Sequence, residues 1–250
     1  MAPLEDWQRG THAADGFAYP TYRRGTGPGV VVMHESPGLT HEVVAFGEEL
    51  VAAGFTVVLP HFFGAADEDP RRLEAARVLP RLCVGREFTV VATGRTTPVA
   101  GWLRSLARQL HADVGGAGVG AVGMCFTGGF ALAMMVDPVV AAPVVAQPAV
   151  PVPLGPRRAA DVGLGTDDLL AVQERVRAGC PVLGVRYRED WSTGTRFETL
   201  AEVLGDGFRR VELDGPGHAT LTAERHPDAV EAVVAFLTER LGPAPVSPSS

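Results

Sequence analysis

Four reactive side chains each follow the end of a short apolar segment of the kind that forms a buried strand. They are Glu35, Cys125, Asp190 and His218. A thiol, an imidazole and a carboxylate are the parts of a nucleophilic site in which a thiolate attacks an acyl carbon. Because ligands bind outside the carboxyl ends of parallel strands, we expect these side chains to gather at that edge of a sheet. The sequence therefore predicts a thiol-based catalytic site.

The segment around Cys125 has the pattern of a nucleophile elbow. In residues 121–130, AVGMCFTGGF, an apolar run ends at Gly123 and the cysteine follows two residues later. Gly128 and Gly129 then open a helix-like stretch. A nucleophile elbow consists of a strand, a sharp turn that holds the nucleophile, and a helix. The N–H groups at the start of that helix favour a negatively charged sulfur.

The residue types suggest a role for each side chain. Cys125 would attack as a thiolate, and His218, at the end of a glycine-rich loop, would take its proton and later protonate the leaving oxygen. Asp190 would hold the imidazole in the required tautomer. The backbone N–H groups of Ser36 and Phe126 are expected to form the oxyanion hole, because they follow the first parallel strand and the nucleophile.

Other residues could fill some of these roles. Glu189 or Asp214 could replace Asp190 as the acid, and His226 is a second candidate for the base. The pair His226-Pro227 has the pattern of a helix start, however, which disfavours that histidine. Glu35 could simply cap the helix that follows it. The remaining cysteines lack a glycine frame and are expected to be structural; they are Cys83 and Cys180.

Two patterns that could indicate a cofactor or a metal are weak. Residues 118–123, GVGAVG, match the dinucleotide pattern G-x-G-x-x-G, but their glycines lie within a predicted strand and not at a strand-to-helix turn. We therefore expect no nicotinamide or flavin site. His34, His41 and His61 lie near Glu35 in the sequence, but no H-E-x-x-H or C-x-x-C spacing occurs, so no metal site is expected.

Short apolar strands alternate with helical segments along the chain. Strands are predicted at 17–23, 30–34, 55–59, 119–123, 139–146, 181–187 and 208–213, and helices at 42–53, 70–78, 99–111, 126–136, 167–178, 195–204 and 227–240. This alternation predicts an α/β fold with a mostly parallel sheet flanked by helices on both faces. The first two strands, joined by the turn 25–29, are expected to form an antiparallel edge. We expect one domain over 1–240 and a flexible tail over 241–250.

Composition narrows the class of protein. A net charge of −7 over 250 residues argues against binding to nucleic acid or to an anionic membrane. The apolar stretch 136–156 is interrupted by six prolines, so we expect a buried strand and a loop there instead of a membrane span. The N-terminus lacks the apolar run of a secretory signal, and three dispersed cysteines do not make a disulfide framework. We expect a cytoplasmic protein that is a monomer or a small homo-oligomer.

The chain resembles the dienelactone hydrolase family, which are α/β-hydrolases with a cysteine nucleophile. The resemblance runs over about residues 22–237 and rests on the segments MHESPGL (33–39), GMCFTGG (123–129), VRYRED (185–190) and GPGH (215–218). It implies hydrolysis of a small ester or lactone through an acyl-thioester intermediate, without a cofactor, in a carboxymethylenebutenolidase-like reaction. It also implies a Cys125–His218–Asp190 triad in which Glu35 restrains the resting cysteine.

Two departures from the family pattern bear on function. Thr127 stands where the family elbow has a glycine, and a β-branched residue there is expected to alter the turn or the orientation of Cys125. Thr222 stands where family enzymes that act on dienelactone have an arginine that clamps the substrate carboxylate. Arg86 is a candidate substrate-binding residue that would supply a charge from elsewhere. These departures leave open an alternative: a non-hydrolytic binding protein or thiol redox sensor on the same scaffold.

Overall fold

The computed structural model describes residues 4–63 and 93–242. Their strands form one eight-stranded sheet in the order β1-β2-β4-β3-β5-β6-β7-β8. The strands are β1 (Gln8–Ala14), β2 (Phe17–Arg24), β3 (Gly29–Met33), β4 (Thr56–Pro60), β5 (Val119–Met124), β6 (Val140–Ala146), β7 (Val182–Tyr187) and β8 (Phe208–Leu213). From β4 to β8 across the sheet every pairing is parallel, which confirms the predicted α/β architecture.

The predicted antiparallel edge is wrong in its partners. The strand at 17–23 does not pair with the strand at 30–34; β2 lies antiparallel between β1 and β4. Strand β3 lies inside the sheet, parallel to both β4 and β5. All five of its residues are buried, which suits a central strand. Strand β1 was missed because it is mostly exposed and polar and gives no apolar alternation.

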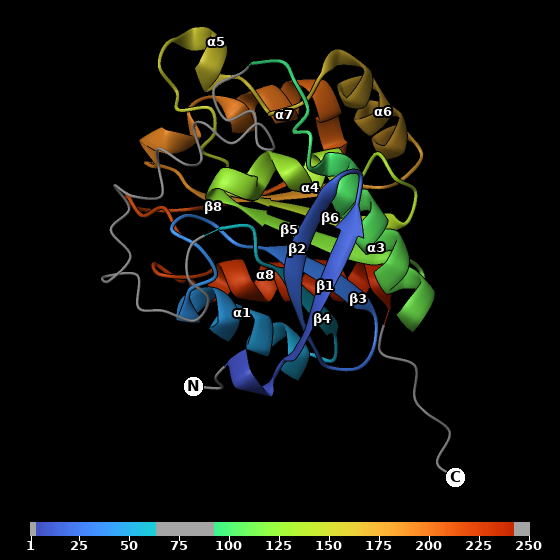
Figure 1. Cartoon of the computed structure of the whole chain (residues 1–250). Coiled ribbons are helices and arrows are strands. Elements are labelled where there is room, and N and C mark those ends of the chain that lie inside the picture. The colour runs from blue at the N-terminus through green and yellow to red at the C-terminus, as the bar shows by residue number, and fades with distance from the viewer. Residues whose placement is uncertain (1–3, 64–92, 243–250) are drawn as a thin grey trace.

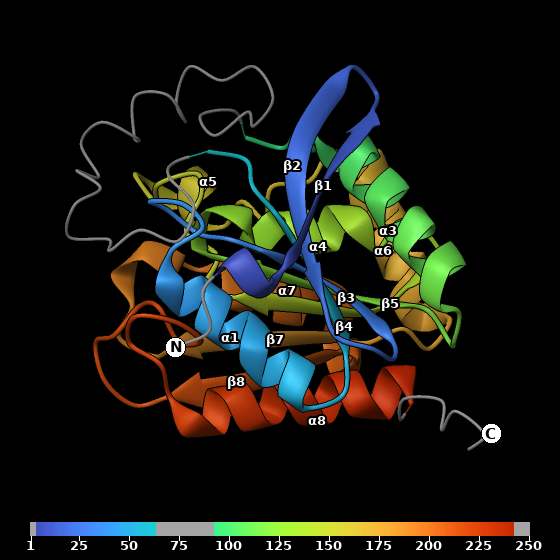
Figure 2. The same cartoon turned by 60° about the horizontal axis from the view of Figure 1, so that its bottom comes forward.

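Helices cover both faces of the sheet (Figures 1 and 2). On one face lie α1 (His41–Ala52) and α8 (Pro227–Leu241); on the other lie α3 (Ala100–Val114), α4 (Gly128–Met134), α6 (Thr166–Arg177) and α7 (Arg196–Leu204). The short α5 (Pro156–Ala159) and the 3-10 turns Leu4–Asp6, Cys125–Thr127, Trp191–Thr193 and Gly205–Gly207 complete the described elements. The helix predicted at 126–136 is a 3-10 turn followed by the shorter α4.

Each face of the sheet has its own apolar core, because successive strand residues point to opposite sides. In β3, Val31 and Met33 join the core under α3 and α4, whereas Val30 and Val32 join the core under α1 and α8. These two cores fix the sheet, so that the loops at its carboxyl edge stand on a rigid base.

Some expectations concern other parts of the chain. The helix predicted at 70–78, Cys83, Arg86 and residues 243–250 of the predicted tail lie outside the described residues. The predicted tail begins one residue too early, because Leu241 is the last residue of α8. The stretch 136–156 forms β6 and a following loop, as expected. No helix among the described residues is long and apolar enough to cross a membrane.

Candidate active site

The backbone around Cys125 has the shape of an elbow. Cys125 directly follows β5 and begins the 3-10 turn Cys125–Thr127, after which α4 starts at Gly128. Its φ of +49° lies in the left-handed region, which costs a non-glycine residue about 1–3 kcal/mol, and residues strained in this way cluster at active sites and ligand clamps. The strand, turn and helix expected around this cysteine are therefore present.

Close backbone approaches explain the glycines around the elbow. A Cβ on Gly123 would overlap the carbonyl oxygen of Thr127, and a Cβ on Gly128 would come within 2.8 Å of the Pro148 backbone. A Cβ on Gly120 would lie 2.7 Å from Leu237 of α8. Gly120 and Gly123 thus serve packing inside β5 and are not part of a phosphate-binding loop.

Thr127 connects the elbow to the sheet through hydrogen bonds. Its side chain is fully buried, and its hydroxyl oxygen lies 3.0 Å from the Met33 carbonyl, 3.1 Å from the Met124 carbonyl and 2.9 Å from the Met124 nitrogen. The hydroxyl accepts the N–H bond and donates its single proton to one carbonyl at a time. A threonine therefore occupies this position without steric conflict.

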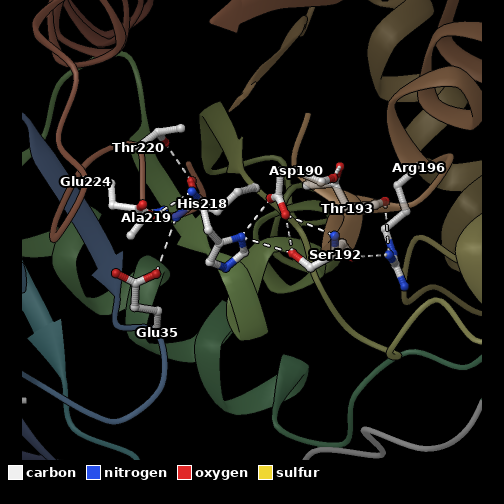
Figure 3. Close-up of polar contacts among 10 residues, drawn as sticks. Glu35, Asp190, Ser192, Thr193, Arg196, His218, Ala219, Thr220 and Glu224 are labelled. Carbon is white, nitrogen blue, oxygen red and sulfur yellow. Dashed lines mark hydrogen bonds and ion pairs between the residues drawn. The ribbon is translucent and has the colours of Figure 1, made fainter. Parts of the chain in front are cut away.

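His218 and Asp190 form a hydrogen-bonded pair beside the elbow (Figure 3). The Nδ1 atom of His218 lies 2.7 Å from the Oδ2 atom of Asp190, and the Asp190 side chain is almost completely buried. Ser192 contacts both residues of this pair. Its hydroxyl donates to Asp190 Oδ1 at 2.6 Å and lies 3.0 Å from His218 Nδ1. Asp190 and Ser192 both point toward the imidazole.

The charges of this pair stabilise each other. Burial alone would lower the pKa of His218, but the bonds to Asp190 and Cys125 and their charges raise it from 6.5 to about 11. For Asp190, burial would raise the pKa, but the bonds from His218 and Ser192 outweigh it and lower the pKa below 3.8. An imidazolium–carboxylate pair is therefore favoured around neutral pH.

Glu35 lies buried at the end of β3, held by two residues from other loops. The Thr222 hydroxyl donates to Oε1, and the Gln147 amide lies 3.4 Å from Oε2. Burial raises the pKa of the Glu35 carboxyl, although these bonds and the nearby His218 partly oppose the shift. Glu35 does not cap the next helix, because the N-cap of α1 is Thr40.

The topology brings three of these groups together. One donor atom each from Glu35, Cys125 and His218 lies within 4.8 Å of the other two. Because Nδ1 of His218 faces Asp190, the nitrogen left for Cys125 is Nε2. Met33 of β3 pairs with Gly123 of β5, so the segments that carry Ser36 and Phe126 both follow the carboxyl ends of these neighbouring strands.

The competing residues lie elsewhere. His226 is the N-cap of α8 and its Nδ1 accepts the Asp228 N–H, as the helix-start pattern predicted. Glu189 is exposed, and Asp214 is fully exposed and paired with Arg188. Cys180 is buried and its thiol contacts the carbonyls of Val140 and Ala141.

The loop that carries His218 is fixed by residues that were not predicted. The carboxylate of Glu224 accepts the backbone N–H of His218 at 2.6 Å and that of Ala219 at 3.1 Å. Thr220 donates to the Gln147 side chain at 2.6 Å, which joins this loop to the end of β6. The sequence could have pointed to Gln147, because a single amide side chain directly follows a predicted buried strand. No sequence pattern marks Glu224.

Arg196 braces the loop that carries the acid. Its side chain is fully buried and donates to five backbone carbonyls, those of Pro151, Arg158, Asp161, Ser192 and Thr193. Burial lowers its pKa to about 10, against the opposing attraction of Asp161, Asp190 and Cys125. Ser192 thus contacts the Asp190–His218 pair through its side chain and Arg196 through its backbone carbonyl (Figure 3).

Solved structures with the same fold cover almost the whole chain. A protein described as a putative dienelactone hydrolase from Klebsiella pneumoniae is 17% identical, with a TM-score of 0.64, and the match covers 94% of this chain and 98% of that one. A dienelactone hydrolase from Anabaena variabilis is 18% identical, with a TM-score of 0.61 and the same coverage. A dienelactone hydrolase-like promiscuous phosphotriesterase from metagenomic libraries is 16% identical, with a TM-score of 0.62, again over 94% and 98%.

These likenesses show an α/β-hydrolase fold of the dienelactone hydrolase type. No curated protein matches the chain significantly. The sequence model of the dienelactone hydrolase family matches residues 15–162, which include Glu35 and Cys125 and end before Asp190 and His218. That match spans more than half of the sequence, so the chain belongs to the dienelactone hydrolase family, a family of hydrolases.

Proposed function

We propose that this protein hydrolyses small carboxylic esters or lactones through an acyl-thioester on Cys125, with His218 as base and acid and Asp190 as its orienting partner. The observation that carries the proposal is the juxtaposition of a strained cysteine with an imidazole whose other nitrogen is bonded to a buried carboxylate. This is the arrangement of nucleophile, base and orienting group that acyl transfer requires.

The proposed reaction has two halves. The Cys125 thiolate attacks the carbonyl carbon, and the resulting oxyanion is stabilised by the N–H groups of Ser36 and Phe126. His218 gives its Nε2 proton to the leaving alkoxide as the carbon–oxygen bond breaks. Water, deprotonated by His218, then attacks the thioester, which releases the carboxylic acid and restores the thiolate.

Glu35 is proposed to control the resting state of Cys125. It lies within 4.8 Å of the sulfur and its burial favours the neutral carboxyl, which can donate a proton toward a thiolate. The Thr222 and Gln147 bonds anchor it in this position. Substrate that enters beside Cys125 would have to displace this carboxyl.

The substrate is proposed to lack a carboxylate. Thr222 occupies the position where dienelactone-cleaving relatives are expected to carry an arginine, and its hydroxyl is engaged by Glu35. Arg86 stays a prediction. A panel of neutral aryl esters, alkyl esters and lactones is therefore the first choice, and one aryl phosphotriester belongs in it because a structural neighbour is described as a promiscuous phosphotriesterase.

The first test replaces the proposed nucleophile. We expect Cys125→Ala to lower kcat/KM for the best ester by roughly 10⁴-fold or more, because the acyl-enzyme can no longer form. Cys180→Ala is the matched control, since that buried thiol is expected to leave the rate within a few-fold of wild type. Thermal unfolding curves of both variants show whether the fold is kept.

Two results would contradict the proposal. One is an undiminished rate in folded Cys125→Ala. The other is a wild-type protein that turns over no ester, lactone or phosphotriester but forms a sulfenic acid on Cys125 under mild peroxide, which would favour the redox-sensor alternative.

A further inference from the structure

Three potential metal ligands converge at the edge of the sheet. A Glu35 oxygen, the Cys125 sulfur and a His218 nitrogen all lie within 4.8 Å of one another. They come from the ends of β3 and β5 and from the loop after β8, so their spacing in the sequence matches no metal motif. We propose that these three side chains form an inhibitory binding site for Zn²⁺.

The donor set has the chemistry that zinc prefers. Zn²⁺ is bound by thiolate, imidazole and carboxylate, with bonds of about 2.0–2.3 Å to four ligands in a tetrahedron. Neighbouring ligands of such a site are about 3.3–3.6 Å apart, whereas the donor atoms here lie within 4.8 Å of one another, so each pair has to close by up to about 1.2–1.5 Å. Rotation of the side chains supplies that movement. A water molecule would take the fourth position.

The ligands are held from behind by further hydrogen bonds. Asp190 bonds Nδ1 of His218 at 2.7 Å, which leaves Nε2 for the metal; a carboxylate behind a histidine ligand is the usual outer-shell arrangement of zinc sites. Thr222 and Gln147 hold the Glu35 carboxylate in the same way. The supporting contacts of a metal site are thus already present.

Charge and access also fit a divalent cation. Once their protons are released, the Cys125 thiolate and the Glu35 carboxylate together carry two negative charges, which neutralise Zn²⁺ in a site that is otherwise mostly buried. Cys125 is half-buried and the His218 side chain is 31% exposed, so an ion can reach the donor atoms from solvent. His34 does not compete, because its two ring nitrogens contact the Glu35 carbonyl and the Phe62 N–H.

Zinc bound in this way would block catalysis. It would occupy the sulfur that attacks the ester and the nitrogen that moves the proton, and any protons on the three ligands would leave to solvent. The inhibition rests on the proposed function, but the binding does not and is measured without turnover.

The test uses Co²⁺ as a spectroscopic probe on the full chain after chelator treatment. We expect one equivalent of Co²⁺ to give a thiolate-to-cobalt charge-transfer band, and Zn²⁺ to remove the band by displacement. Cys125→Ala should abolish the band, Glu35→Gln should weaken binding at least tenfold, and Asp190→Asn should weaken it by about 10–100-fold because the carboxylate charge behind His218 is lost. The matched control Cys180→Ala should retain the band and the affinity.

A second arm measures inhibition in the wild type. Zn²⁺ at the concentration that saturates the site should abolish ester hydrolysis, and a chelator should restore it. The inference is overturned if no saturable cobalt band forms, or if the band survives in folded Cys125→Ala. An active metal-free esterase without the band would contradict only the zinc site, whereas a normal band without any hydrolysis would contradict only the proposed function.

Discussion

Thr127 is the residue whose chemistry matters most to the shape of the elbow. A glycine there would allow the same turn, but the threonine hydroxyl adds contacts to Met124 and to Met33 of the neighbouring strand. These contacts join β3 and β5 directly below Cys125. The departure from the family pattern is therefore compensated by hydrogen bonds inside the sheet.

Replacing this hydroxyl tests its contribution. Thr127→Val keeps the shape of the side chain but leaves the buried Met124 N–H without its partner, so we expect the free energy of unfolding to fall by about 1–3 kcal/mol. Thr238→Val is the control, because that exposed hydroxyl bonds only a helix carbonyl. Urea unfolding compares the two variants, and equal losses would contradict the assigned role.

The Asp190–His218 pair makes a prediction about pH. NMR titration of the wild-type protein, after chelator treatment, should show an imidazolium that persists well above pH 7, because the pKa of His218 is raised to about 11. In Asp190→Asn that pKa should fall, since the carboxylate bond and charge are lost. A wild-type imidazole that titrates at its ordinary value of 6.5 would contradict the pairing.

The Asp190–His218 pair also determines how the free energy of unfolding changes with pH. A raised histidine pKa stabilises the fold fully below 6.5, and this stabilisation is lost as the pH rises toward 11. A lowered Asp190 pKa stabilises the fold above 3.8, and this is lost as the pH falls through the lower folded value. The cost of Asp190→Asn should therefore be largest between about pH 4 and 6.5 and shrink at alkaline pH, as unfolding curves at several pH values would show.

At the level of elements, the site depends on loops that are tied to one another. The loop after β8 has to cross from the edge of the sheet toward β5, and bonds from Thr220 and Thr222 attach it to the ends of β6 and β3. The loop after β7 is attached through Arg196 to the chain between β6 and α6. These ties place side chains from distant strands at one point.

Among these loop contacts, we expect the hydrogen bonds of Arg196 to contribute most to the free energy of unfolding. Arg196→Met leaves five backbone carbonyls without this donor, so we expect a loss of about 3–5 kcal/mol in the free energy of unfolding, together with a lower kcat as Ser192 loses its support. Arg209→Met is the control, because the exposed Arg209–Glu239 pair should contribute at most about 1 kcal/mol. Unfolding by urea and ester hydrolysis are measured for both variants.

The stability losses of the two arginine variants test whether Arg196 braces the loop after β7. A small, similar cost for both substitutions would contradict the bracing role of Arg196. If Arg196→Met does not fold, Arg196→Lys keeps the charge but cannot satisfy the same carbonyls, and it should still lose stability relative to Arg209→Lys.

At the scale of the molecule, the sequence predicted the parallel sheet because its central strands are continuous apolar runs. It also predicted the convergence of Glu35, Cys125 and His218, since each follows a strand end in an architecture that collects such residues at one edge. The domain assignment, oligomeric state and compartment stay predictions.

The parts that the sequence did not predict depend on contacts between distant segments. The polar strand β1 is placed by its pairing with β2 and by the contacts of its buried His12 with α3, so the edge of the sheet is not the expected hairpin. The bonds of Thr127, Arg196 and Glu224 run to backbone groups, and no local pattern of residue types records them.

Detection of the acyl-thioester on Cys125 tests the proposed mechanism most directly. Wild-type protein would be mixed with a slowly released activated ester, quenched during turnover, and analysed by mass spectrometry of its peptides. We predict that the acyl group appears on the peptide that contains Cys125, and that it forms and decays at rates consistent with turnover. Hydrolysis that proceeds while this peptide stays unmodified at every time point would contradict the central claim.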